Sequence, residues 1–373
     1  MATKLFDQAK KNKADEFYTQ LTDIEKELKH YKSQFKGKTV FCNCDDPYWS
    51  DFFYFFVAKF NEFGLNKLIT THYIDNEISL FSDVFPEKPY SLAITKTPKD
   101  LLSLDRPAMI THIIKENSGR NYLKGDGDFR SAESIELLKE ADIVVTNPPF
   151  SLFREYVAQL IEYNKNFIII GNSNAISYKE IFKLFKDNKI WIGPSIHSGD
   201  REFQVPNTYP LEAATCRVDE NGRRFIRVKG VRWFTNMDFK ARHDDLILYR
   251  NFNKDDYPIY ENYDAINVDV TKEIPHDYFE AMGVPITFVD KYNPDQFEVI
   301  ALGIVGSIDF SSERKMEILK NGQLTGKYTI NAKGTLYRIY NPKKDTKPPA
   351  FKDVETGELY SSIYARIIIK RKK

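Results

Sequence analysis

Four consecutive residues, Asn147-Pro148-Pro149-Phe150, carry the clearest chemical signal in the 373-residue chain. The Asn147 side-chain oxygen and the Pro148 carbonyl can each accept an N–H bond, and the paired prolines fix φ and so aim that carbonyl. Two such acceptors can localise the lone pair of a conjugated amino group, as in adenine, which is otherwise a poor nucleophile. Phe150 offers an apolar platform for a base swung out of a duplex, a stacking contact worth about 1–3 kcal/mol. The alternative is an ordinary strand-to-helix turn, in which Asn and Pro are common.

The elements around this tetrapeptide predict an open α/β sheet. Residues 142–146 form an apolar run that leads directly into the prolines, and such sheets bind ligands at the carboxyl ends of their strands. Buried strands are also expected at 38–44, 67–73 and 166–171, with helices between them, which predicts right-handed crossovers in a parallel sheet. Helices are expected at 21–35, 131–140 and 178–185. Two more are expected: a phenylalanine-rich helix that is capped by Asp46 and ends at Gly64, and a helix that is capped by Ser151.

Less regular strands are expected at four further places. Two of them, 90–95 and 108–114, lie in an elaborated connection. The other two, 212–218 and 224–234, are joined by Asn221-Gly222, which is a strong signal for a hairpin turn. Beyond about residue 236 the alternation of helix and strand fades, which predicts two domains, 1–235 and 236–373.

Composition narrows the class of protein. A hydrophobic content of 42% is typical of a globular chain that can bury a core. No stretch approaches the ~20 apolar residues of a membrane span and the N-terminus has no signal-peptide pattern, so a cytoplasmic protein without membrane association is expected. Three cysteines and six scattered histidines predict neither a disulfide framework nor a metal site.

Charge is distributed unevenly although the net charge is only +1. Residues 251–310 carry 3 Lys+Arg against 12 Asp+Glu, whereas residues 311–373 carry 15 against 6. The basic C-terminal segment, which ends in four consecutive cations at 370–373, could meet phosphates. A solvated charged face with a frayed tail is the alternative reading.

At this point the chain resembles a known family, the EcoRI-type adenine-specific DNA methyltransferases. The resemblance covers most of the chain and is densest in Asp15-Glu-Phe-Tyr-Thr-Gln20, Phe41-Cys-Asn-Cys-Asp-Asp-Pro47, Gly125-Asp-Gly-Asp-Phe-Arg-Ser131 and Thr146-Asn-Pro-Pro-Phe-Ser-Leu-Phe-Arg-Glu155. It implies the class I S-adenosylmethionine-dependent methyltransferase fold, an α/β fold whose mostly parallel sheet ends in an antiparallel hairpin. Residues 1–235 would be the catalytic domain that binds S-adenosylmethionine, and 236–373 an α+β region for DNA target recognition.

The resemblance also implies an activity and partners. The expected reaction is methyl transfer from S-adenosyl-L-methionine to the N6 amino group of adenine in double-stranded DNA, by base flipping and direct in-line displacement without a metal. The protein would be a monomer and the modification enzyme of a restriction–modification system, in which a cognate endonuclease could act on the same site without a stable complex.

Cofactor-binding residues follow from the same resemblance. Their types fit contacts to the methionine end, ribose and adenine of the cofactor, although a turn or capping role is the alternative for each carboxylate. The first strand-to-helix turn departs from the family pattern because it has no Gly-x-Gly. The implied residues are Tyr18, Thr19, Cys44, Asp45, Asp46, Asp75, Asp126, Asp128 and Phe129.

Basic residues that alternate with tyrosines in the C-terminal segment, and arginines near the active-site end, could contact DNA. A charged surface without a ligand is the alternative for any one of them. The candidates are Arg201, Arg223, Arg224, Lys315, Lys327, Lys333 and Arg338, with Arg227, Arg314, Lys343, Lys344 and Lys347 as further members beside Tyr328, Tyr337 and Tyr340.

Two other functions remain open. A methyltransferase of the same fold could act on an RNA base amine or a protein glutamine amide, because these nitrogens pose the same lone-pair problem. A protein-directed enzyme would be expected to keep a glycine-rich loop and to lack the basic C-terminal segment. The second is a catalytically inactive DNA-binding homologue, against which the intact Asn147–Phe150 and Asp128-Phe129 argue.

Overall fold

The structure is a computed structural model that describes residues 19–73, 88–98, 101–205, 216–310, 313–330, 332 and 334–373. It consists of two compact units. Unit 1 contains residues up to Ala175 together with Ile190–Phe239, and unit 2 contains Ile176–Lys189 together with Lys240–Lys373.

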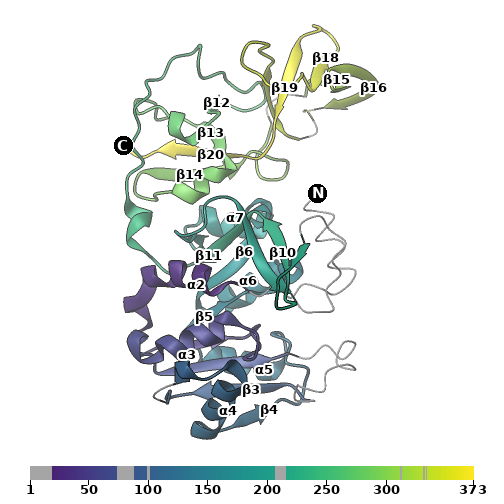
Figure 1. Ribbon diagram of the computed structural model, residues 1–373. Coiled ribbons are helices and arrows are strands. Elements are labelled where there is room, and N and C mark those ends of the chain that lie inside the picture. Colours follow the sequence, from purple (N-terminus) through teal and green to yellow (C-terminus); the bar gives the residue numbers. More distant parts are fainter. Residues whose placement is uncertain are drawn as a thin grey trace. The chain divides into compact units, whose positions relative to one another are not determined.

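Unit 1 is built on an eight-stranded sheet with the order β4-β3-β2-β1-β5-β6-β11-β7 (Figure 1). The central strands β2, β1, β5 and β6 are parallel, and β3, β4, β11 and β7 each pair antiparallel with their neighbours. This mostly parallel sheet confirms the expected class I methyltransferase fold. The strands are β1 (Thr39–Cys42), β2 (Lys67–His72), β3 (Tyr90–Ile94), β4 (Arg120–Tyr122), β5 (Ile143–Thr146), β6 (Asn166–Asn172), β7 (Trp191–Ile192) and β11 (Val231–Thr235).

Helices cover both faces of this sheet. Trp233 and Phe234 are neighbours on β11 and therefore point to opposite faces. Trp233 packs edge-on against Phe52 of α3, and Phe234 packs against Phe153 of α6, so these two helices lie on opposite sides. The helices of unit 1 are α2 (Leu21–Leu28), α3 (Asp51–Phe63), α4 (Arg106–Glu116), α5 (Ala132–Glu140) and α6 (Phe153–Glu162).

Two of the expected helix caps are wrong. Ser50, not Asp46, caps α3, because the Ser50 hydroxyl accepts from Phe52 N and Phe53 N, while Asp46 closes a separate turn by accepting from Tyr48 N. Ser151 lies inside a 3-10 helix, Phe150–Leu152, and the N-cap position of α6 is Leu152. The expected helix at 21–35 is α2 followed by a 3-10 helix, Lys29–Phe35.

The segment 108–114, expected as a strand, belongs to helix α4. Asp105 caps this helix by accepting from Ala108 N, and Pro107 occupies its first turn, where a missing N–H costs nothing. Spacing at three and four residues then buries Met109, Ile110 and Ile113 together. The apolar run was too short to distinguish helix from strand by periodicity.

The hairpin at Asn221-Gly222 is present, but it lies in a separate three-stranded sheet with the order β8-β10-β9. Gly222 adopts φ +75°, as this tight turn requires. The expected strand 224–234 is interrupted at Gly230, and its second half, β11, supplies the antiparallel strand of the main sheet. Residues 212–215 of the other expected strand lie outside the described residues. The small sheet contains β8 (Asp200–Val205), β9 (Cys216–Val218) and β10 (Arg224–Lys229).

Unit 2 contains two sheets, with the orders β12-β13-β20-β14 and β16-β15-β18-β19-β17, and α7 (Lys179–Lys186) contacts β14. The basic C-terminal run is not a frayed tail, because β20 extends to Arg371 and buries Ile367, Ile368 and Ile369 between β13 and β14. No helix among the described residues has the length and apolar character needed to span a bilayer. The strands are β12 (Ile266–Asn267), β13 (Met282–Pro285), β14 (Phe297–Leu302), β15 (Lys315–Lys320), β16 (Gln323–Ile330), β17 (Leu336–Ile339), β18 (Phe351–Asp353), β19 (Leu359–Ile363) and β20 (Arg366–Arg371).

Candidate active site

The Asn-Pro-Pro-Phe segment lies at the carboxyl end of β5, as expected. Asn147 follows the last residue of the strand and is half-buried, and Pro148 is buried. Phe150 begins the short 3-10 helix and meets Phe203 of β8 edge-on, with ring centroids 6.4 Å apart. The small sheet therefore supports the aromatic residue of the motif.

Asp45 lies next to this segment, at the end of β1, and it is only 5% exposed. Its Oδ2 accepts a hydrogen bond from Thr146 Oγ1 at 2.5 Å, and its Oδ1 accepts one from Ser50 Oγ at 2.7 Å. Burial raises the pKa of Asp45 to about 7, although both hydrogen bonds act to lower it. The carboxylate is directed into the protein, so we do not retain Asp45 as a direct cofactor ligand.

Asn43, two residues earlier, connects β1 to α6. Its Oδ1 accepts from the Tyr156 hydroxyl, and Thr71 Oγ1 donates to its backbone carbonyl at 2.7 Å. Tyr156 in turn meets Phe129 edge-on at 5.0 Å. Sequence reasoning missed Asn43 and Tyr156 as site residues. A signal for Asn43 was present in the sequence, because it is a polar residue at the end of an apolar strand within the 41–47 segment.

The loop 125–131 is fixed against the end of β2. Gly127 has φ +86°, and a Cβ added there would lie 2.8 Å from the His72 carbonyl oxygen, so only glycine fits without a shift. Asp126 accepts from Asp128 N and thus shapes the turn. Phe129 is buried, and its carbonyl accepts from Gln159 of α6. The ends of β1, β2 and β5 and the loop 125–131 therefore form one edge of the sheet.

Asp128 forms a bidentate ion pair with Arg130, at 2.9 Å from Nε and 2.7 Å from Nη2. Partial burial acts to raise the pKa of Asp128, but the hydrogen bonds from Arg130 outweigh it and the net shift is downward. A carboxylate oxygen has two lone pairs. Acceptance of a ligand amino group by Asp128 is thus compatible with the ion pair and stays a prediction.

His72 Nδ1 lies 2.6 Å from Asp46 Oδ2. The His72 ring packs against the Tyr90 ring in a tilted arrangement with centroids 5.1 Å apart, and Arg120 lies over the Tyr90 ring while donating to the Tyr48 hydroxyl. Asp46 and Cys44 are each half-buried, so both retain a surface toward solvent at the edge of the sheet.

Among the buried polar atoms at this edge that have no hydrogen-bond partner within the described residues are Asn43 Nδ2 and Thr19 Oγ1. Leu21, two residues after Thr19, donates its N–H to Asp51 at the start of α3, which places this segment beside the first strand-to-helix turn. Unsatisfied buried polar groups are costly, so both atoms fit contacts to a polar ligand such as a methyl donor. Tyr18 and Asp75 lie outside the described residues.

The arginines expected to meet DNA in unit 1 lie on the small sheet. Arg223 is exposed and pairs with Asp219 at 2.7 Å. Arg201 is half-buried, with Nε 3.6 Å from Asp23, and Arg224 is half-buried at the start of β10. Arg217, which sequence reasoning did not select, lies over the Phe225 ring at 4.2 Å.

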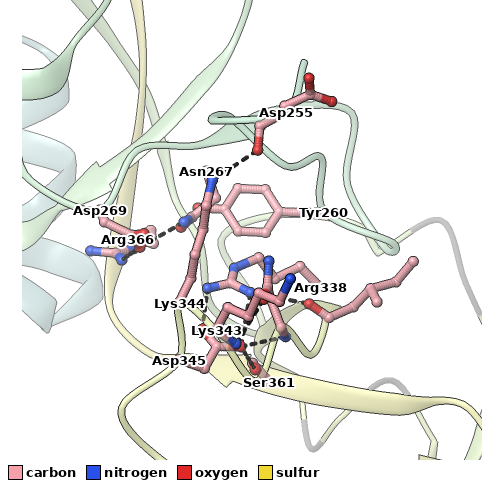
Figure 2. Close-up of polar contacts among 12 residues, drawn as sticks. Asp255, Tyr260, Asn267, Asp269, Arg338, Lys343, Lys344, Asp345, Ser361 and Arg366 are labelled. Carbon is pink, nitrogen blue, oxygen red and sulfur yellow. Dashed lines mark hydrogen bonds and ion pairs between the residues drawn. The ribbon is translucent and has the colours of Figure 1, made fainter. Parts of the chain in front are cut away.

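In unit 2, Lys315 and Lys327 are exposed on the β15–β16 hairpin, and Lys333 lies outside the described residues. Arg338 is not available to DNA: it is 5% exposed and its terminal nitrogens bind Asp345 at 2.5 and 3.1 Å. Figure 2 shows this pair together with Ser361, which also donates to Asp345. Arg338 is therefore structural.

The fold and the Asn-Pro-Pro-Phe motif at the end of β5 define a class I methyltransferase that acts on an amino nitrogen. Residues 5–372 match the model of a family described as "Adenine-specific methyltransferase EcoRI". The chain belongs to this family of adenine-specific DNA methyltransferases.

Three relatives agree with this assignment. Type II methyltransferase M.EcoRI of Escherichia coli is 49% identical over 299 residues, which cover 80% of this chain and 88% of that protein. Type II methyltransferase M.MgeORF184P of Mycoplasma genitalium is 40% identical over 301 residues, with 79% and 85% covered. Type II methyltransferase M.MpnI of Mycoplasma pneumoniae is 39% identical over 299 residues, with 79% and 84% covered. No solved structure matches the chain.

Proposed function

We propose that this adenine-specific methyltransferase transfers a methyl group from S-adenosyl-L-methionine to the N6 amino group of an adenine flipped out of double-stranded DNA. The observation that carries the proposal is the position of Asn147-Pro148-Pro149-Phe150 at the carboxyl end of β5, beside the ends of β1 and β2. Ligands of open α/β sheets bind at this edge.

Asn147 and Pro148 act on the target amino group. The Asn147 side-chain oxygen and the Pro148 carbonyl accept its two N–H bonds and direct the nitrogen lone pair away from the ring. Phe150 stacks on the flipped base. The attacking nitrogen becomes positively charged as the new bond forms, so two oxygen acceptors stabilise it more than they stabilise the neutral amine.

S-adenosyl-L-methionine supplies a methyl group on a sulfonium, a good leaving group that takes the bonding electron pair when the nitrogen attacks. Thr19 and Asn43 would hold the cofactor through their unpartnered polar atoms, since both border the first strand-to-helix turn. Further contacts to the cofactor are predicted for residues at the edge of the sheet, namely Cys44, Asp46, Asp126, Asp128 and Phe129. Tyr18 and Asp75, which lie outside the described residues, are predicted to contact it as well.

Unit 1 is the proposed catalytic domain and unit 2 the proposed target-recognition region. Lys315 and Lys327 on the exposed hairpin, and Arg223 on the small sheet, present positive charge that suits contact with phosphates. Arg201, Arg224 and Lys333 stay predictions. The chain is further proposed to be a cytoplasmic monomer whose modification protects DNA from a cognate endonuclease.

One assay tests the function directly. The purified chain is incubated with labelled S-adenosylmethionine and, separately, with duplex DNA, RNA or protein extract, and the products are digested. Label recovered as N6-methyladenine from DNA supports the proposal. Label recovered only from RNA or protein would contradict it and favour the amine or amide substrate of the same fold.

A further inference from the structure

The ends of β1 and β5 are joined by side chains rather than by the sheet. The last backbone pair of their ladder is Phe41 with Val144, two residues before β5 ends. Beyond this pair, Asp45 Oδ2 accepts from Thr146 Oγ1 at 2.5 Å. Thr146 is the residue directly before Asn147, so this bond fixes the chain one peptide unit from the proposed acceptor.

Asp45 is itself held from the other side. Ser50 donates to Asp45 Oδ1 at 2.7 Å while its oxygen accepts from Phe52 N and Phe53 N at the start of α3. The Asp45 carbonyl also accepts from Thr70 Oγ1 at 2.6 Å. The carboxylate therefore links the capped end of a helix to the end of the catalytic strand.

This link is shielded from water. Thr146 is fully buried and Asp45 is 5% exposed, and a hydrogen bond to a carboxylate is stronger where water does not compete. Burying a carboxylate is costly, and neither α3 nor β5 needs it for its own backbone hydrogen bonds. Asp45 is a buried acid between the start of α3 and the end of β5. If stability alone were required, an apolar contact could replace it at a lower cost in free energy.

We propose that Asp45 is a positioning residue for methyl transfer, which holds Thr146 and thereby sets the place of Asn147 relative to the reacting amino group. The inference rests on the proposed function in that Asn147 is taken as the acceptor. Loss of the bond removes the side-chain contact that holds Thr146, and with it the position of Asn147. The rate of methyl transfer therefore falls, while the binding of S-adenosylmethionine and of DNA persists.

The test compares Thr146→Val with Thr146→Ser in the full-length protein. Valine removes the hydroxyl at nearly constant volume, and serine keeps it. We expect Thr146→Val to lower the single-turnover rate constant by about 10- to 100-fold, the effect typical of a small misplacement. The dissociation constants for S-adenosylmethionine and DNA should stay the same, and Thr146→Ser should recover most of the rate.

Thr235→Val is the matched control. Thr235 is also fully buried, and its hydroxyl donates to the Phe167 carbonyl at 2.7 Å, away from Asp45. This variant should unfold more easily than the wild type yet transfer methyl groups at the wild-type rate. A loss of rate equal to that of Thr146→Val would show that any buried hydroxyl has this effect, which overturns the proposal.

A second readout does not depend on turnover. Carbon-13 NMR of the Asp45 carboxyl should show a higher pKa in Thr146→Val than in the wild type, because the lost hydrogen bond favours the charged form. Asp46 and Asp51 also raise this pKa, and neither changes in the variant. An unchanged pKa would mean that the Thr146 bond is absent in solution.

An unchanged rate in Thr146→Val, or a Thr146→Ser variant as slow as the valine variant, overturns the proposal. If Thr146→Val does not fold, Asp45→Leu, which has no acceptor for the Thr146 hydroxyl, is measured in the same way, and an unchanged rate in it has the same meaning. If the wild type methylates RNA or protein rather than DNA, the proposed substrate is wrong, and the rates are then compared on the substrate that accepts the label.

Discussion

The end of β5 in unit 1 and the β15–β16 hairpin in unit 2 hold their polar residues in opposite ways. Around β5, Asp45 and Thr146 are buried and bonded to each other. On the hairpin, Lys315 and Lys327 are exposed, and the Lys315 ammonium lies 5.2 Å from the centre of the Tyr328 ring. Buried groups that share partners should respond to mutation as a unit, whereas exposed charges should contribute independently.

The largest expected effect is at the catalytic edge. Asn147→Ala removes one of the two acceptors for the amino group, and loss of one such group typically costs about 10²–10³ in rate. Binding of S-adenosylmethionine should persist, because Asn147 touches the base rather than the cofactor in the proposed arrangement. Single-turnover assays and equilibrium binding measure the two effects separately. Near-normal turnover in this variant would refute the mechanism.

The second largest effect is expected on the stability of unit 2, and it tests whether Arg338 has a structural role or contacts DNA. Arg338→Ala leaves the half-buried Asp345 carboxylate without its bidentate partner, though Asn341 N and Ser361 Oγ still donate to it, so the loss should stay below the roughly 3–5 kcal/mol of a fully buried pair. Urea unfolding should show this loss. The exposed pair of Lys139 with Glu136 offers a control, since Lys139→Ala should leave the unfolding curve unchanged. A stable Arg338→Ala variant with weakened DNA binding would return Arg338 to the interface.

Glu27 allows a third prediction, on how stability depends on pH. Like Asp45, it is a buried carboxylate of unit 1. Burial raises its pKa from 4.5 to about 7, against the hydrogen bonds from Ser195 and Tyr31. Between about pH 4.5 and 7 the folded chain keeps a proton that the unfolded chain has released, so stability falls as pH rises through this window. The contribution is at most roughly 1.4 kcal/mol per pH unit.

Glu27→Gln removes this contribution, so its free energy of unfolding should fall less between pH 5 and pH 8 than that of the wild type. Asp45, whose pKa is also raised to about 7, adds a similar slope that remains in the variant. Urea unfolding at several pH values measures both slopes. Identical slopes in the variant and the wild type would show that Glu27 ionises normally.

The smallest effects are expected on the hairpin. Lys315→Ala and Lys327→Ala should each weaken DNA binding several-fold at low salt and reduce the salt-dependence slope by about 1, because each removes one phosphate contact. The double variant should show additive losses, unlike the buried pair around Asp45. Lys139→Ala on α5 is again the control. Unchanged salt slopes in both hairpin variants would remove β15–β16 from the proposed interface.

Local signals predicted much of the fold. Gly64 ends α3 in the left-handed conformation, α5 lies within the expected helix 131–140, and Asn221-Gly222 forms its hairpin. Each depends on neighbouring residues only, so the sequence was sufficient. The failures, Asp46 and Ser151 as caps and 108–114 as a strand, concern choices between two local solutions that the surrounding packing decides.

The sequence by itself predicted the chemistry proposed for the active site, because Asn147-Pro148-Pro149-Phe150 follows an apolar strand and its backbone direction is fixed by the prolines. It also determined that a parallel α/β sheet presents this segment at an edge. Only the tertiary structure decided which carboxylates face that edge. Asp45 and Asp46 are adjacent in sequence, yet Asp45 turns inward to Thr146 and Ser50 while Asp46 meets His72. Their partners come from other strands and helices, so no local pattern could distinguish the two.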